Sequence, residues 1–447
     1  MKSITKTRYA SMLVLFTVWT ILFTSCSTDI SNPNGEPTLG TLVPAGQQVR
    51  YVSIGNSLTA GYINGACFEA GQNNSYPSIL ARQLNAVDFV QPIYGGEGQI
   101  GGNGRQYLTG IDATTGRPII TTSLAGITPV LTSNPIEKPF SNLGIPGALL
   151  ADVLDTTDYS SKATARKNPF FATILRSQTL GKTIIAQAAA LKPNVMSIWI
   201  GSNDVLGYAT TGGADPNFTE PTNIFKFESL YLNMMFLINN TPDLKDTKII
   251  LGTVPDITAV PFFTYANTWM KATYGKILPL IISTPGSTQK VRQLDSNGKD
   301  LLLLPILTLL ASDPTYGQSI TKPIPSQYVL DMDEVVKVKT ATTEYNIKIK
   351  SVIGNEKWDP QKRCVLFDAY SIFNEIAANG APVPGDILTN TYISGGIFSL
   401  DGIHPTSRGY ALVANRLIEL INSKFGANVK KVNPMDYTGI PIETPVK

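Results

Sequence analysis

The sequence has 447 residues, of which 43% are hydrophobic, and its 36 basic and 33 acidic side chains give a formal net charge of +3. This balance disfavours a nucleic-acid partner, because binding to a phosphate backbone needs a surplus or a stripe of basic residues. The composition has no low-complexity bias and the chain has no internal repeat, which excludes a solenoid or a propeller and indicates a globular protein.

The first 25 residues are organised as a targeting segment. Lys2, Lys6 and Arg8 form a charged region, and residues 12–23 form an apolar run. A run of this length is too short to span a bilayer comfortably and is typical of a signal peptide. Removal of residues 1–25 takes away three basic and no acidic side chains, so the remaining chain has a formal net charge of zero.

The end of this segment resembles a bacterial lipoprotein signal, in which a cysteine becomes the lipidated first residue. Cys26 follows Phe23-Thr24-Ser25, although Phe23 stands where a leucine is usual. Ser27 comes next rather than an aspartate, which by resemblance favours the outer membrane of the cell envelope, on its periplasmic or its outer side. We therefore expect an exported chain whose membrane contact is a lipid on Cys26. Cleavage by an ordinary signal peptidase, with Cys26 incidental, is the alternative.

Composition also divides the rest of the chain. Residues 26–46 contain several prolines and glycines and predict a flexible tether after the signal peptide. Residues 47–430 predict the folded domain, with an insertion at about 254–363, and residues 431–447 are left as a C-terminal tail.

Short apolar runs alternate with helical patterns along the folded domain. This alternation predicts an α/β fold with a parallel sheet, and helices on both faces explain why the strands are continuous apolar runs. Residues 93–135 predict a hairpin or loop, and residues 140–148 predict a glycine-rich turn. The expected strands are 49–54, 118–122, 195–200, 247–253 and 364–368, and the expected helices are 75–84 with Ser75 as its cap, 183–191, 225–238, 370–378 and 406–425.

Residues 254–363 exceed what this alternation needs. Apolar residues at spacings of three and four predict a helix over 335–352, although residues 336–339 would also suit a strand. We interpret the region as an insertion packed on the main sheet, which serves either as a lid or pocket wall or as scaffolding.

Two cysteines, Cys67 and Cys364, remain after the signal peptide. In an oxidising compartment they could form a disulfide. The alternative is that both are buried as small hydrophobic side chains.

Ser57 lies in the turn Gly55-Asn56-Ser57, directly after the strand expected at 49–54. A serine at a strand-to-helix turn exposes its oxygen and leaves its own backbone N–H free near a helix N-terminus, which suits a nucleophile. The same residues are also common in plain turns, so the rest of the chain has to decide between the two.

His404 is the only histidine in the chain. Histidine is the residue type best suited to accept and return a proton near neutral pH. Asp401 precedes it by three residues, and an aspartate at this spacing in a turn can reach the imidazole Nδ1–H, which leaves Nε2 free for a serine. A single histidine also argues against a zinc site built from histidines. Neither a metal nor an organic cofactor is expected.

Two further turns offer hydrogen-bond donors. Gly147 lacks a side chain, so its backbone can approach a substrate closely. Asn203 follows the strand expected at 195–200 and offers a side-chain NH₂ group. Ligands bind beyond the carboxyl ends of parallel strands, so the turns at Ser57, Gly147 and Asn203 should face the same rim of the sheet.

Four short motifs together resemble the SGNH/GDSL hydrolase family of esterases and lipases. They are Gly55-Asn56-Ser57-Leu58-Thr59, Asn142-Leu143-Gly144-Ile145-Pro146-Gly147, Gly201-Ser202-Asn203-Asp204 and Asp401-Gly402-Ile403-His404-Pro405. Asn56 replaces the usual aspartate of the first motif. The resemblance implies a three-layer α/β/α sandwich with a mainly parallel, flavodoxin-like sheet of about five strands, and it leaves the insertion unexplained.

The resemblance also implies the function. Ser57, Asp401 and His404 would be the catalytic residues, and the oxyanion would be held by Ser57, Gly147 and Asn203. We therefore expect an exported serine ester hydrolase that cleaves a small-molecule, lipid or acylated-glycan ester through an acyl-serine intermediate. A carbohydrate O-acetylesterase would use the same residues and is an alternative. An alternative of another class is a non-catalytic surface-binding lipoprotein on the same fold.

Overall fold

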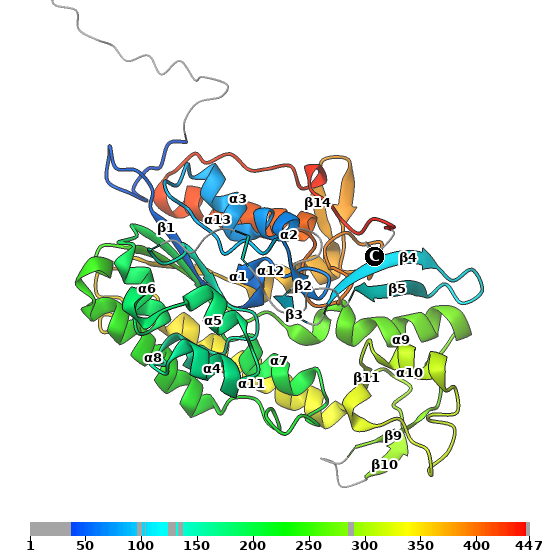
Figure 1. Cartoon of the computed structure of the whole chain (residues 1–447). Helices are drawn as coiled ribbons and strands as arrows, with labels where there is room; N and C mark the ends of the chain where they lie inside the picture. The colour runs from blue at the N-terminus through cyan, green and yellow to red at the C-terminus, as the bar shows by residue number, and fades with distance from the viewer. Residues whose placement is uncertain are drawn as a thin grey trace, which may run out of the picture. The chain divides into compact units, whose positions relative to one another are not determined.

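The computed structural model of the chain describes residues 37–95, 101–102, 104–123, 131–132, 137–284 and 290–443 (Figure 1). All of them belong to one compact unit, Pro37–Lys447. The predicted signal peptide and Cys26 lie outside the described residues, so export and lipid attachment stay predictions. Within the described ranges, no helix is both long and apolar enough to cross a membrane.

A parallel sheet of five strands forms the middle layer of this unit (Figure 1). Its strands, in spatial order, are β13 (Cys364–Phe367), β8 (Lys248–Gly252), β7 (Val195–Trp199), β1 (Tyr51–Gly55) and β6 (Asn142–Gly144). Numbered along the chain, this is the 2-1-3-4-5 order of flavodoxin-like sheets. The α/β fold with a parallel, flavodoxin-like sheet is thereby confirmed.

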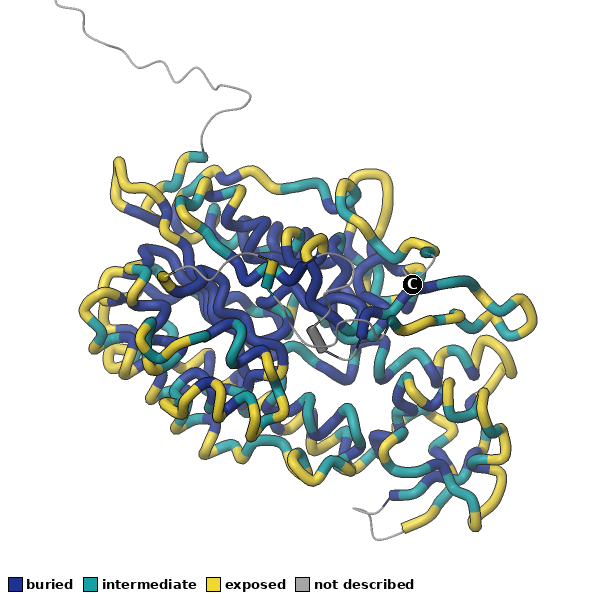
Figure 2. The backbone as a smooth tube through the Cα atoms, in the orientation of Figure 1, coloured by how far each residue is buried: buried dark blue, intermediate teal, exposed yellow. Residues whose placement is uncertain are grey.

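Side chains from the strands fill a separate core on each face of the sheet. Along β1, Tyr51 packs in one core, whereas Val52 and Ile54 pack in the other. Figure 2 shows the central strands as buried. One face is covered by α6 (Ile184–Ala190), α8 (Ile224–Asn240) and α11 (Met332–Val352), and the other by α3 (Tyr76–Gln83) and α13 (Ser407–Phe425). The predicted three-layer sandwich follows from this division.

Polar side chains fix the starts of three predicted helices. Ser75, Thr183 and Thr406 accept backbone N–H groups from the first turns of α3, α6 and α13 at 3.4, 3.0 and 3.0 Å. These contacts satisfy donors that have no partner inside the helix. The local sequence therefore specifies where these helices begin.

Segment 140–148, predicted as a turn, contains a strand of the main sheet. Asn142, Leu143 and Gly144 pair with β1 in parallel register. A Cβ atom on Gly144 would lie 2.4 Å from the backbone nitrogen of Ala60, so only glycine fits there. Three residues that include Asn and Gly have little intrinsic β propensity. Tertiary pairing creates this strand, which is why the sequence pattern did not reveal it.

The predicted insertion 254–363 is in fact two different segments. Its last helix, α11, comes between β8 and β13 in the chain and packs in the same core as α8. Parallel strands need such a crossover connection, so α11 belongs to the sandwich, and the strand alternative for 336–339 is wrong. The preceding part, 254–331, contains α9 (Pro261–Tyr274) and two small antiparallel pairs, around a separate hydrophobic cluster.

The tether predicted over residues 26–46 does not extend to residue 46. Leu42 and Val43 are buried, and the Thr41 N–H donates to the Phe425 carbonyl at 2.7 Å. Burial of the two apolar side chains offsets the cost of ordering this proline- and glycine-containing backbone. The compact unit therefore begins at Pro37, earlier than the predicted boundary.

Cys67 and Cys364 are both buried and both free. Burial raises the pKa of each thiol. The alternative of two small buried side chains is confirmed, and the disulfide alternative is wrong.

The remaining elements connect or flank these layers. β4 and β5 form the hairpin that was predicted within 93–135. The other strands are β2 (Ala66–Cys67), β3 (Gly101–Gly102), β4 (Arg105–Ile111), β5 (Pro118–Ser123), β9 (Ile281–Ser283), β10 (Val291–Gln293), β11 (Leu301–Leu302), β12 (Val329–Leu330), β14 (Ala381–Val383) and β15 (Asp386–Leu388). The other α-helices are α1 (Ser57–Ala60), α2 (Glu69–Asn73), α4 (Tyr159–Ala165), α5 (Phe170–Leu175), α7 (Asn203–Ala209), α10 (Ile306–Ser312) and α12 (Ala369–Asn379).

Candidate active site

Ser57 is the first residue of α1, directly beyond the carboxyl end of β1. The preceding Asn56 side chain accepts the Leu58 N–H at 3.0 Å and caps this short helix. Position 55 requires glycine, because β1 passes so close to β7 here that a Cβ on residue 55 would lie 2.6 Å from the Trp199 carbonyl oxygen. In the described part of the chain, the Ser57 N–H donates to no protein acceptor. The turn thus presents a hydroxyl and a free donor side by side.

His404 approaches Ser57 from a loop near the end of the chain. Its Nε2 lies 2.7 Å from the Ser57 Oγ, although the two residues are 347 positions apart in the sequence. Its Nδ1 lies 3.0 Å from Oδ2 of Asp401. An ionised carboxylate only accepts, so Nδ1 carries the hydrogen and Nε2 is left to accept the Ser57 proton. The structure therefore brings the three predicted side chains into one hydrogen-bonded chain.

The Asp401 carboxylate is almost fully hydrogen-bonded. Besides His404, it accepts the backbone N–H groups of Ile403 at 2.9 Å, His404 at 2.8 Å and Gly65 at 3.0 Å. Burial alone would raise the pKa of Asp401, but the adjacent His404 and these donors outweigh it and hold the pKa below its ordinary value. The carboxylate stays ionised and is fixed in orientation.

Residues 62–65 hold the loop that carries Asp401 and His404, and the sequence motifs did not reveal them. The Tyr62 ring packs against the His404 imidazole with centroids 4.7 Å apart. The Asn64 side chain accepts the Leu400 N–H at 2.9 Å, and the Asn64 N–H donates to Ser399 Oγ at 3.0 Å. Asn-Gly at 64–65 marks a turn in the sequence. No local signal shows that its partners lie more than 330 residues away.

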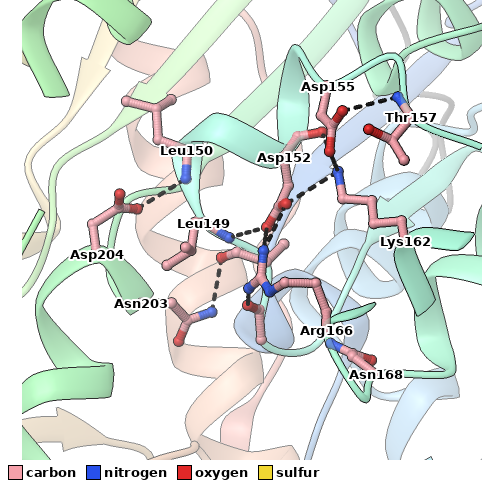
Figure 3. A network of polar contacts seen from close by, with 12 residues as sticks. Leu149, Leu150, Asp152, Asp155, Thr157, Lys162, Arg166, Asn168, Asn203 and Asp204 are labelled. Atoms are coloured by element: carbon pink, nitrogen blue, oxygen red, sulfur yellow. Dashed lines mark hydrogen bonds and ion pairs between the residues drawn. The ribbon is translucent and has the colours of Figure 1, made fainter. Parts of the chain in front are cut away.

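Hydrogen bonds and an ion pair from neighbouring side chains support the turn around Gly147; Figure 3 shows part of this network. Gly147 has a φ of 77°, which favours glycine. Its carbonyl accepts Arg166 Nη2 at 3.2 Å, and the preceding Pro146 carbonyl accepts Asn168 Nδ2 at 2.7 Å. Arg166 is itself oriented by an ion pair with buried Asp152 at 2.8 Å. The sequence motifs did not predict the positioning roles of Arg166 and Asn168, because α4 and its flanking residues carry no unusual pattern.

The donor at the centre of this turn has no partner of its own. Among the described residues, the Gly147 N–H donates to no protein group. The N–H of Gly144 is in contrast engaged by the Asn142 side chain at 3.0 Å. Of these two glycines in the motif, only Gly147 therefore has a backbone donor to offer.

Asn203 begins α7, at the carboxyl end of β7. One hydrogen of its NH₂ group donates to the Ala148 carbonyl at 2.9 Å (Figure 3), and within the described ranges the second hydrogen has no protein acceptor. Asn203, Ser57 and His404 line one cavity, whereas Gly147 does not line it. Gly147 is connected to this cavity through the contact between its neighbour Ala148 and Asn203.

Replacing Asn203 with alanine should lower kcat for ester hydrolysis by roughly 10²- to 10³-fold, the usual cost of losing one oxyanion donor. KM should change much less, because the donor acts on the charge that develops in the transition state. Steady-state kinetics on a soluble ester measures both constants. Asn240→Ala, which alters an exposed asparagine at the end of α8, should leave kcat unchanged. A loss of less than threefold in Asn203→Ala would contradict the role.

Most of the chain, including the residues of this site, matches one known protein family. The sequence profile described as GDSL-like lipase/acylhydrolase matches residues 51–417, which is most of the chain. The chain belongs to the GDSL-like lipase/acylhydrolase family. The matched range begins at β1 and ends within α13, so it includes every element of the five-stranded sheet.

Solved structures similar to this GDSL-like chain include two enzymes at low identity. One is LAE5, an alpha/beta hydrolase enzyme from the metagenome of Lake Arreo, Spain, with 13% identity, a TM-score of 0.35, and coverage of 86% of this chain and 98% of that one. Another is Axe2, an acetylxylan esterase from Geobacillus stearothermophilus, with 14% identity, a TM-score of 0.34, and coverage of 84% and 95%. No curated protein sequence matches the chain.

Asp204 of this GDSL-like chain links the Gly147 turn to α7. Its carboxylate accepts the Leu150 N–H at 2.9 Å (Figure 3). It also accepts the Thr222 hydroxyl at 2.8 Å. Burial raises the pKa of Asp204 to about 6, despite these two donors. The side chain therefore holds the turn in place, but its ionisation in the buried site costs free energy, and this cost depends on pH.

The raised pKa of Asp204 predicts that the free energy of unfolding of the protein depends on pH. Because the folded-state pKa of Asp204 is raised, its contribution is most favourable below the unfolded pKa and is lost as the pH rises towards 6. Asp204→Asn keeps the shape and removes the ionisation. Between pH 4 and pH 7, the free energy of unfolding of the wild type should fall by about 2 kcal/mol relative to this variant. Urea unfolding at both pH values measures the difference, and a difference that does not change with pH would contradict the prediction.

Apolar side chains complete the cavity that Ser57, Asn203 and His404 line. They come from α1 and α7, from the end of β7, from residues 255–260 beyond β8, from α12 and from the loop that carries His404. The apolar residues are Leu58, Trp199, Leu206, Pro255, Ile257, Val260, Phe373, Phe398, Ile403 and Pro405. Three of them, Pro255, Ile257 and Val260, belong to the segment predicted as an insertion, so its first residues form a pocket wall.

Proposed function

We propose that the chain is a serine ester hydrolase that acts through an acyl-serine intermediate. The observation that carries this proposal is the continuous contact from Asp401 through His404 to the Ser57 hydroxyl, at 3.0 and 2.7 Å. The turns around it contain the Ser57 and Gly147 N–H groups and one hydrogen of Asn203, for which the described part of the chain provides no acceptor. Family membership supports the same reaction class.

In this mechanism, Ser57 Oγ attacks the ester carbonyl carbon as its proton passes to His404 Nε2. The resulting oxyanion accepts hydrogen bonds from the Ser57 N–H, the Asn203 amide and the Gly147 N–H. Collapse of the tetrahedral intermediate breaks the bond to the alcohol oxygen, which takes the proton from His404. Water then attacks the acyl carbon while His404 Nε2 accepts one of its protons, and collapse of this second tetrahedral intermediate breaks the bond to Ser57 Oγ. Ser57 Oγ takes the proton back from His404, and the carboxylic acid is released. Asp401 stabilises the imidazolium formed at each step.

Deacetylation of a glycan would use the same groups, so it remains the alternative within the esterase class. A non-catalytic binding protein is the alternative of another class. The filled positions at Ser57, Asp401 and His404 favour an enzyme over the latter.

A fluorophosphonate that reacts with activated serines tests the enzyme proposal. The purified protein should form one adduct, which peptide mass spectrometry should locate on Ser57. Ser57→Ala should not be labelled, whereas Ser351→Ala, which alters an exposed serine of α11, should be labelled like the wild type. Absence of an adduct, or an adduct on another residue, would overturn the proposal.

A further inference from the structure

The cavity beside Ser57 differs from an open cleft for a sugar chain. Among the residues that the structure describes, Ser202 is the only polar side chain of the lining besides the catalytic groups and Asn56. Apolar walls stabilise a hydrocarbon group, but a sugar hydroxyl placed there would lose its hydrogen bonds to water. The group that enters this cavity is therefore hydrocarbon in character.

The reaction sequence indicates which half of the ester this group belongs to. The alcohol must leave, and water must take its place, before the acyl-serine is hydrolysed. The acyl group stays attached to Ser57 through both steps. A partly enclosed apolar cavity beside the oxyanion donor Asn203 suits the group that stays, whereas the alcohol needs an open path to solvent.

The cavity is also small. Its volume is about 40 Å³, and about 10–15 Å³ is enough for one water molecule. Space for roughly three water-sized groups corresponds to an acyl chain of about two to four carbons. We propose that this cavity is the acyl site and that it selects acetyl to butyryl esters; the inference rests on the proposed serine hydrolase mechanism.

Packed aromatic side chains limit the length of the acyl group. The Trp199 indole N–H donates to the Thr253 carbonyl at 2.9 Å, which fixes the ring. The Phe373 ring lies 6.4 Å from Trp199 and 6.4 Å from Phe398, measured between centroids. Protein interiors are closely packed, so a longer chain would have to displace these rings.

Phe373 is the side chain best placed for a test. It lies on α12 and lines the cavity, and it makes no hydrogen bond to the Ser57, His404 and Asp401 chain. It is only partly buried, so truncation should leave the fold intact. Removing its ring should extend the acyl site by several carbon atoms.

The experiment measures kcat/KM for 4-nitrophenyl acetate, butyrate, hexanoate and octanoate. The wild type should prefer acetate or butyrate and lose about tenfold or more at hexanoate. In Phe373→Ala, the ratio of hexanoate to acetate activity should rise about tenfold or more, since each buried methylene is worth about fourfold, or ~0.8 kcal/mol. Phe373→Leu should give a smaller shift in the same direction. Phe236→Ala, which alters an exposed phenylalanine of α8, should keep the wild-type profile.

A flat profile, a preference for octanoate, or an unchanged profile in both Phe373 variants would overturn the inference. A second series of acetates with alcohols of increasing length would also overturn it if selectivity follows the alcohol. Fluorophosphonate labelling of the same samples distinguishes a failure of the acyl-site assignment from a failure of the proposed serine hydrolase mechanism. An adduct on Ser57 together with a long-chain preference would refute the acyl-site assignment alone. Absence of the adduct would refute the proposed serine hydrolase mechanism as well.

Discussion

Ser57→Ala should lower kcat for ester hydrolysis by roughly 10⁶-fold, and His404→Ala should cost about as much. The serine hydroxyl supplies the bond that forms, and Nε2, 2.7 Å away, receives the proton that this bond formation releases. Because each group is ineffective without the other, the double variant should lose little more than either single variant. Some activity above the uncatalysed rate should remain, since the oxyanion donors stay in place.

Single-turnover and steady-state kinetics with a 4-nitrophenyl ester measure these losses. Circular dichroism and thermal unfolding check that each variant is folded. If the two single losses multiplied in the double variant, Ser57 and His404 would act independently and the mechanism would be wrong. Retention of more than a hundredth of wild-type kcat in either single variant would contradict it as well.

Asp401→Asn should lower kcat by roughly 10⁴-fold while the fold is kept. An amide oxygen can still accept the N–H groups of Ile403 and His404, now held by Oδ1 at 2.9 and 2.8 Å. The amide nitrogen would then face His404 Nδ1, where it donates a hydrogen and moves the imidazole proton to Nε2. In that tautomer, Nε2 no longer accepts the Ser57 proton.

A matched control for this variant is Asp386→Asn, which alters an exposed aspartate of β15 and should leave kcat unchanged. The ring nitrogens of His404 can be followed directly by ¹⁵N nuclear magnetic resonance, because the chain has one histidine. The spectrum should show the hydrogen on Nδ1 in the wild type and on Nε2 in Asp401→Asn. If Asp401→Asn keeps more than a tenth of the activity, Asp401 does not set the tautomer.

The sequence predicted those features of the fold that have a local physical cause. The strands β1, β7, β8 and β13 are short apolar runs, because their sheet is covered on both faces. The helix starts at Ser75 and Thr406 follow from side-chain capping. The strand β6 and the packed segment 37–46 were missed, because their structure depends on pairing with residues elsewhere in the chain.

The same division applies to the candidate site. Ser57, Asp401 and His404 were predicted because their residue types and spacing reflect the chemistry itself. Tyr62, Asn64 and Arg166 act through contacts with those groups or with the Gly147 turn, and such contacts leave no pattern in the local sequence. The role of α11 was missed for a related reason: a long segment before it hides the crossover from β8 to β13.

The distance of 347 positions between Ser57 and His404 has a consequence for the chain as it is made. During synthesis, Ser57 is added early and His404, which would accept its proton, is added near the end. N-terminal parts of a chain generally fold first. A nascent chain therefore contains Ser57 before it contains the side chain that would accept the Ser57 proton in the proposed mechanism. In the proposed mechanism, Ser57 becomes reactive only after the loop before α13 has docked onto residues 62–65. A chain that stops before this loop, through a premature stop codon or proteolysis, would lack both Asp401 and His404, and with them the proton transfer on which the proposed mechanism depends.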